Sequence, residues 1–261
     1  MGIFDGLKKS KAKKENLTFS DQWDIYLSQK EDLNYFIRFD TALANLTENE
    51  KKKYPHTIEL RVSFVGKYDQ SEMERLNIIE DNFNRGSNDI HFIGGLTDSS
   101  YRFFIFCCGG AADDVNGVIQ TLMSANKGVA FSTEVFLNDN LSYYDKILAP
   151  NRYEKKWMRN RKVCDALERA GETFKKPRLI DFYCYFTSPQ YIKDIADKTS
   201  AQGFKELAQR KSADGEYLLH LTLEDVPAFD RINDITNGIL DLLDGTDGCF
   251  DGWGCPAHKD E

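Results

Sequence analysis

The feature that most constrains the fold is an order of strand-like and helix-like segments that occurs twice along the chain. In the first half, strands are predicted at about 57–64, 89–93, 101–108 and 129–137, and apolar and polar residues alternate in the first and last of these segments. Between them, apolar residues recur at helical spacing at 71–83 and 113–122. Ser71, with Glu74 three residues later, is a capping-box signal for the first of these helices.

The second half repeats this order. Strands are predicted at 180–186, from 204 onward, at 217–223 and at 249–253, with helices at 189–203 and from 227 onward. Each half therefore reads β-α-β-β-α-β, the ferredoxin-like arrangement. We expect an α+β protein with two consecutive ferredoxin-like domains, each an antiparallel sheet with helices packed on one face.

The domain boundaries follow from shifts in composition. Residues 1–18 form a basic lead without apolar periodicity, and we expect it to be disordered. Residues 19–150 make the first domain, which begins with a hairpin around 23–39 and ends in a segment rich in Asn, Asp and Tyr. The second domain covers 151–258 and begins with a basic helix at about 153–170.

Charge and hydropathy limit the kinds of partner that we expect for this protein. The net charge of the 261 residues is −8, which disfavours direct nucleic-acid binding and favours a basic protein surface as the partner. The longest apolar run has six residues, at 103–108, so no stable membrane association is expected. The six cysteines form no Cys-x-x-Cys pair and no secretion signal is visible, which favours the cytoplasm. The oligomeric state stays open.

An acidic stretch in the second domain is the main candidate for partner binding. Residues 214–251 hold ten acidic side chains and one basic side chain. A run of this kind is usually the solvated face of a helix. If the domain binds a basic tail, the expected contact residues are Glu224, Asp225, Asp230, Asp234, Asp241 and Asp244.

No motif for catalysis, cofactor binding or metal binding stands out. The four histidines are not arranged in a known catalytic or zinc motif, and the chain has no Walker loop and no Gly-x-Gly-x-x-Gly. Cys249, Cys255 and His258 offer three soft ligands, but a structural zinc site requires four. The Asp and Gly residues at 244–252 fail the EF-hand spacing. We expect a protein that is not an enzyme and needs no cofactor.

Aromatic residues on the strand at 180–186 raise the alternative of a base-stacking sheet. Tyr183 and Tyr185 lie opposite Phe182 and Phe186, as in sheets that bind single-stranded RNA. Asp181 shares their face, and the basic residues of such sheets are missing. We therefore expect the leading helix at 153–170 to cover this face with Trp157.

Four segments of the second domain carry a resemblance to a known family. They are the basic helix at 159–171, the strand at 176–186, the helix end at 201–204, and the closing Asp251-Gly252-Trp253-Gly254. In this order they resemble the bacterial regulator of ribonuclease E activity B (RraB) family. The first domain looks like the domain-of-unknown-function family 695, on Trp23-Asp-Ile-Tyr26, the strand at 103–108 and the helix at 115–122.

The resemblance implies a non-catalytic regulator that binds protein. RraB-like proteins bind the non-catalytic region of ribonuclease E and damp RNA processing, so the implied partner is a ribonuclease or its basic disordered segment. A shared fold does not by itself transfer that function. The alternative hypothesis is a small-ligand-binding or enzymatic module with its site in the first domain.

Overall fold

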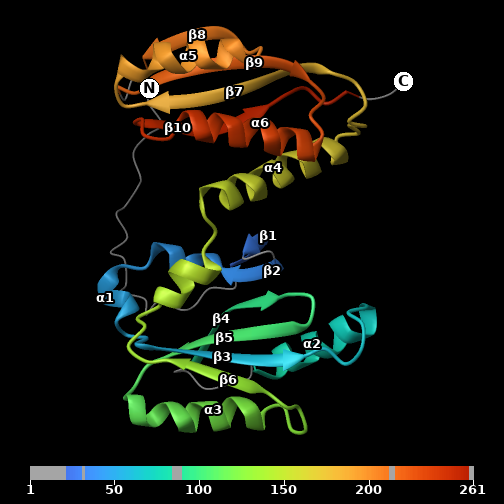
Figure 1. Cartoon of the computed structure of the whole chain (residues 1–261), viewed down its shortest axis with the longest axis vertical. Coiled ribbons are helices and arrows are strands. Elements are labelled where there is room, and N and C mark those ends of the chain that lie inside the picture. The colour runs from blue at the N-terminus through green and yellow to red at the C-terminus, as the bar shows by residue number, and fades with distance from the viewer. Residues whose placement is uncertain (1–21, 31–32, 84–89, 212–214, 259–261) are drawn as a thin grey trace, which may run out of the picture. The chain divides into compact units, whose positions relative to one another are not determined.

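The computed structural model describes residues 22–30, 33–83, 90–211 and 215–258. The expected basic lead at 1–18 lies outside these residues. The chain divides into two compact units, Met1–Ala149 and Pro150–Glu261, and each combines an antiparallel sheet with helices (Figure 1). The protein is therefore α+β. None of the helices in the described ranges has the length and apolar character needed to cross a membrane.

The N-terminal unit is built on a six-stranded sheet with the order β1-β2-β4-β5-β3-β6. Its strands are β1 (Trp23–Lys30), β2 (Leu33–Asp40), β3 (His56–Ser63), β4 (Ile90–Thr97), β5 (Tyr101–Cys108) and β6 (Ser132–Phe136). Its helices are α1 (Glu48–Lys51), α2 (Gln70–Phe83) and α3 (Val115–Ser124). The predicted hairpin at 23–39 is β1 and β2, and it joins the sheet through β4.

Both faces of this sheet are covered. Helices α2 and α3 pack on one face, where Leu76 and Ile119 share a core with Leu60 and Phe104. Helix α2 begins at Gln70, ahead of the expected capping box, because the carboxylate of Asp69 accepts a hydrogen bond from the Glu72 amide at 3.0 Å.

The opposite face of the N-terminal sheet is covered by the segment that precedes the C-terminal unit. Tyr144 and Leu148 lie on a short helical turn, Tyr144–Leu148, and both are fully buried. The Tyr26 hydroxyl donates to the Leu148 carbonyl at 3.0 Å, and the Tyr144 hydroxyl donates to the Asp40 carbonyl at 2.7 Å. This segment is therefore part of the N-terminal core.

The C-terminal unit is built on a four-stranded sheet with the order β10-β7-β9-β8 (Figure 1). Its strands are β7 (Arg178–Phe186), β8 (Lys205–Lys211), β9 (Tyr217–Asp225) and β10 (Gly248–Gly254). Its helices are α4 (Arg152–Arg169), α5 (Ile192–Ala201) and α6 (Phe229–Leu242). Helix α4 begins at Arg152 because Asn151 and Glu154 form a capping box.

All three helices of this unit pack on the same face of the sheet. Alternate residues of β7 point into one core, and Phe182 and Cys184 in it are fully buried. Cys164 of α4, Ile195 of α5 and Ile239 of α6 belong to that core as well. No helix among the described residues of this unit packs on the other face of the sheet, which we call the helix-free face.

Candidate partner-binding surfaces of the C-terminal unit

Three of the six predicted partner-binding carboxylates lie on one exposed stripe of α6. Asp230, Asp234 and Asp241 follow each other at intervals of four and seven residues, which places them on one side of the helix. All three are exposed, whereas Ile232 and Ile239 on the opposite side are buried. Asp230 and Asp234 form no hydrogen bond or ion pair with another described residue. On this stripe, Asp230 and Asp234 are therefore the carboxylates available to a basic partner.

The C-terminal end of the stripe is engaged with α4. The Tyr153 hydroxyl donates to Asp241 Oδ1 at 2.6 Å, and Arg152 Nη1 lies 2.9 Å from Asp244 Oδ1. Arg152 also lies over the Tyr153 ring, 4.7 Å from its centroid. Asp241 and Asp244 therefore connect the start of α4 to the end of α6.

The side chains of Glu224 and Asp225, at the end of β9, point to opposite faces of the sheet, as those of neighbouring strand residues do. Asp225 lies on the helix side, where Arg231 Nη2 contacts its Oδ2 at 2.8 Å. Glu224 is exposed and stands opposite Leu179 on the helix-free face. The acidic run is continuous in sequence, but the structure divides it between two surfaces.

Trp253 of the closing segment Asp251-Gly252-Trp253-Gly254 belongs to the core, whereas Asp251 is exposed. The Trp253 indole is 8% exposed and donates to Asn160 Oδ1 of α4 at 2.9 Å. The Asn160 amide then donates to Asn233 Oδ1 at 2.9 Å and to Thr236 Oγ1 at 2.8 Å, both on α6. This buried network ties β10, α4 and α6 together through the side chain of Trp253.

The expectation that Trp157 covers the helix-free face of the sheet was wrong. Trp157 was expected to cover Tyr183 and Tyr185, but it packs on α6, with its ring 5.3 Å from the Phe229 ring. The reason is the buried side of α4, where Cys164 contacts the same core as Phe182. A helix that packs there cannot also reach the far face of the sheet.

Three polar and aromatic side chains meet on this helix-free face. His220 Nε2 lies 2.8 Å from Asp181 Oδ1, and the His220 ring stacks on Tyr183 with 4.7 Å between centroids. Burial and the charge of Asp181 raise the pKa of the Tyr183 phenol. The three side chains come from β7 and β9, where Tyr183 and His220 are directly paired.

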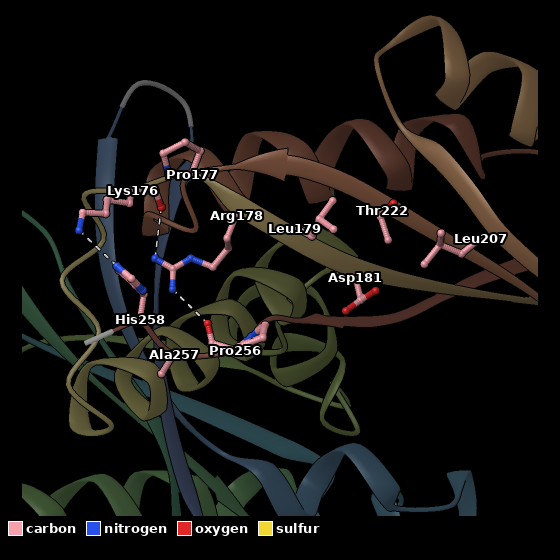
Figure 2. A pocket seen from close by; sticks show the side chains of 10 residues that line it. All are labelled: Lys176, Pro177, Arg178, Leu179, Asp181, Leu207, Thr222, Pro256, Ala257 and His258. Atoms are coloured by element: carbon pink, nitrogen blue, oxygen red, sulfur yellow. Dashed lines mark hydrogen bonds between the residues drawn. The ribbon is translucent and has the colours of Figure 1, made fainter. Parts of the chain in front are cut away.

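A hollow of about 430 Å³ continues this face toward the chain's C-terminal tail (Figure 2). Leu179 and Leu207 form part of its wall and are 56% and 59% exposed, with Asp181 and Thr222 beside them. Our sequence reasoning did not single out this hollow. Strand alternation places Leu179 and Asp181 on the face opposite Ile180 and Phe182, which is the only sequence signal for it.

The rim of the hollow is fixed by a buried ion pair. Glu172 is 4% exposed and accepts hydrogen bonds from Arg178 Nη2 at 2.7 Å, from the Phe174 amide at 2.6 Å and from the His258 amide at 2.7 Å. Burial alone would raise the pKa of Glu172, but these hydrogen bonds outweigh it and lower the pKa. Arg178 Nη1 also donates to the Pro256 carbonyl at 3.0 Å (Figure 2). The tail is thereby held against the start of β7.

The residues considered as metal ligands do not converge. All six cysteines are free; Cys249 is exposed on β10, whereas Cys255 is partly buried against the core. His258 Nε2 lies 3.3 Å from the Lys176 ammonium. Within the described ranges, no three His, Cys, Asp or Glu side chains are grouped so that they could hold a metal ion.

The alternative hypothesis placed a ligand-binding or enzymatic site in the N-terminal unit. A shallow hollow of about 660 Å³ lies beside the turn at Gly109 and Gly110, at the start of α3. Asp114 is the one titratable side chain in its described lining, and it accepts a hydrogen bond from the Ala111 amide at 3.3 Å. This lining does not bring together an acid and a base.

The C-terminal unit thus has the properties of a binding module, with an antiparallel sheet, helices on one face and two separate exposed surfaces. Residues 157–255 match the model of the family described as "Regulator of ribonuclease activity B" (RraB). The C-terminal unit therefore contains an RraB-like domain, and the match covers less than half of the chain.

No curated protein matches the chain. A solved structure, described as "Crystal Structure of an Unknown Protein from Galdieria sulphuraria", is 10% identical and covers 75% of this chain and 95% of its own. Its TM-score is 0.20, so it carries no argument about the fold of this chain.

Proposed function

We propose that this protein is a non-catalytic regulator that binds a protein partner through its RraB-like domain and inhibits ribonuclease E-type RNA processing. The observation that carries the proposal is the match of residues 157–255 to the RraB family model. The family name refers to regulation of a ribonuclease, and RraB-like proteins are regulators rather than catalysts.

The surface chemistry supports a basic partner segment. Asp230 and Asp234 present two carboxylates without an internal partner, and the chain as a whole has a net charge of −8. Complementary charge would speed the encounter with a Lys- and Arg-rich segment and set its position on α6. Glu224, Asp225, Asp241 and Asp244 belong to the proposed contact set, but three of them already have partners inside the unit.

The proposal is tested with purified ribonuclease E in two forms, one complete and one limited to the catalytic region. We expect the chain to slow cleavage of a fluorescent RNA by the complete enzyme and to leave the catalytic region unaffected. Calorimetry with the isolated non-catalytic segment measures binding directly. Unchanged cleavage together with no measurable binding would refute the proposal.

We further propose that both units are ferredoxin-like and that the N-terminal unit is related to domain-of-unknown-function family 695. The strand order β10-β7-β9-β8 supports the first part, as does β4-β5-β3-β6 within the N-terminal sheet. The described boundary near Ala149 supports two domains, at 19–150 and 151–258. A cytoplasmic location, where a ribonuclease would be met, belongs to the same proposal.

A further inference from the structure

A second hollow in the C-terminal unit, of about 310 Å³, lies between α4 and β10. Its lining is Lys156, Arg159, Asn160, Lys162, Val163, Asp251, Gly252 and Trp253. Three of these side chains are cationic and one is a carboxylate, so the lining has a net charge of +2 when all are ionised. The acidic stripe of α6 contributes nothing to this lining.

Lys156 is the unusual member of the lining because it is buried. The residue is 4% exposed, and its ammonium lies 4.0 Å from the centroid of the Phe250 ring. Its two hydrogen-bond acceptors are the carbonyls of Phe250 and Asp251, each at 3.3 Å. Lys156 forms no ion pair with any described carboxylate.

A buried ammonium without an anionic partner is unfavourable, because its neutral carbonyl acceptors and the Phe250 ring supply no counter-charge. Burial, and then the neighbouring charge of Arg159, lower the pKa of Lys156 to about 8. Arg159 is exposed on the rim of the hollow. The hollow therefore offers a cation that an anion would stabilise, with a second cation at its opening.

We propose that this hollow binds the dianionic phosphate group of inorganic phosphate or of a phosphate monoester. The charge of the group matches the net charge of the lining. Lys156 would contact the phosphate oxygens from the buried side, and Arg159 would close over them from the rim, as a charge-assisted pair. Val163 and Trp253 form the apolar part of the wall. This site goes beyond the proposed ribonuclease regulation and does not depend on it.

The test is an NMR titration of the complete chain with inorganic phosphate, at constant ionic strength maintained with sodium chloride. The reporters are the Gly252 amide and the Trp253 indole N–H, both at the hollow. We expect saturable shifts, and we expect Arg159→Gln to weaken the affinity by about fivefold, the effect of one lost charge-assisted contact. Lys193→Gln, which removes an exposed lysine of α5 away from the hollow, is the charge-matched control and should bind as the parent does.

Proton uptake gives a second readout that a merely structural Lys156 would not produce. A bound dianion favours the ammonium form, so calorimetry at about pH 8, where Lys156 titrates, should show protons taken up on binding. No saturable shift, equal weakening by the two variants, or binding without proton uptake would each overturn the proposal.

Different probes separate the sources of the phosphate group. Glycerol 3-phosphate tests a monoester, and a short single-stranded RNA tests the phosphodiester backbone. Binding of inorganic phosphate or glycerol 3-phosphate supports the proposal. Tighter binding of the RNA than of either dianion would assign the hollow to nucleic acid and overturn it.

Discussion

Trp253 Nε1 donates a 2.9 Å hydrogen bond to Asn160 Oδ1, and this contact joins the last strand of the C-terminal unit to its first helix. Asn160 is 1% exposed, so neither group has ready access to water. A buried polar group that loses its partner retains the full cost of desolvation. The contact therefore fixes the position of β10 relative to α4.

The first prediction concerns this network. Asn160→Ala leaves the Trp253 N–H and two acceptors on α6 without a partner, so we expect a loss of about 2 kcal/mol in the free energy of opening. Amide hydrogen exchange at Phe182 of β7 measures that free energy locally. Asn237→Ala, on a partly exposed position of α6, is the control and should change it little. Equal losses in the two variants would contradict the role assigned to Asn160.

The second prediction uses two glycines of β10. A Cβ at Gly248 would lie 2.6 Å from both Leu243 Cδ2 and Phe186 Cε1, whereas a Cβ at Gly252 would meet nothing within 4 Å. Phe186 and Leu243 are themselves buried and cannot move aside easily. We expect Gly248→Ala to destabilise the unit by about 1–3 kcal/mol, the usual cost of overpacking.

The control for that change is Gly252→Ala, which should be close to neutral. Urea denaturation followed by tryptophan fluorescence compares the midpoints of the two variants. A Gly252→Ala midpoint as low as that of Gly248→Ala would show that β10 tolerates no side chain at either place.

The third prediction concerns the Glu172–Arg178 pair and its pH dependence. Glu172→Gln leaves the buried guanidinium without its counter-charge, so we expect a loss of about 3 kcal/mol at neutral pH. The folded-state pKa of Glu172 lies below its ordinary value of 4.5. The stabilisation is therefore present above about pH 4.5 and is lost as the pH falls through the folded-state pKa.

Urea denaturation of the parent and the variant at several pH values checks this sign. The difference between the two proteins should shrink as the solution becomes acidic. Glu168→Gln, on the exposed side of α4, is the control and should show no such trend. A difference that grows on acidification would rule out the assigned charge state.

The fourth prediction follows from the proposed function. Replacing Asp230 and Asp234 together by lysine should weaken binding of the basic ribonuclease segment by about tenfold, since two attractions become repulsions. The salt dependence of binding should fall as well. Asp197→Lys, on the exposed surface of α5, is the control for net charge and should have a much smaller effect. Equal effects would mean that binding does not involve the α6 stripe.

Local patterns in the sequence predicted much of the fold. Alternating apolar residues at Ile180, Phe182, Cys184 and Phe186 predicted β7. Successive side chains of a strand point to opposite faces, so a strand with one buried face has an apolar residue at every second position. Helical spacing likewise predicted the buried side of α6, and hence the exposed position of Asp230 and Asp234.

The remaining features were not determined by the local sequence pattern alone. Trp157 was assigned to the wrong surface, because the amphipathic pattern of α4 shows that one side is buried but not which sheet face buries it. The capping of α2 by Asp69 also went unpredicted, since several polar residues near a helix start compete for that role. The hydrogen bond from the His258 amide to Glu172 joins residues far apart in the chain, so it depends on the folded path between them.

The strand order of the C-terminal unit has a consequence for its synthesis. β10 is the last strand to be made, yet it pairs directly with β7, the first strand of the sheet. Until residues 248–254 have left the ribosome, β7 has an open edge, and the Asn160 amide oxygen lacks the indole donor. The domain must therefore complete its sheet after translation of this region, and any truncation within β10 would leave a nascent chain with an exposed strand edge prone to aggregation.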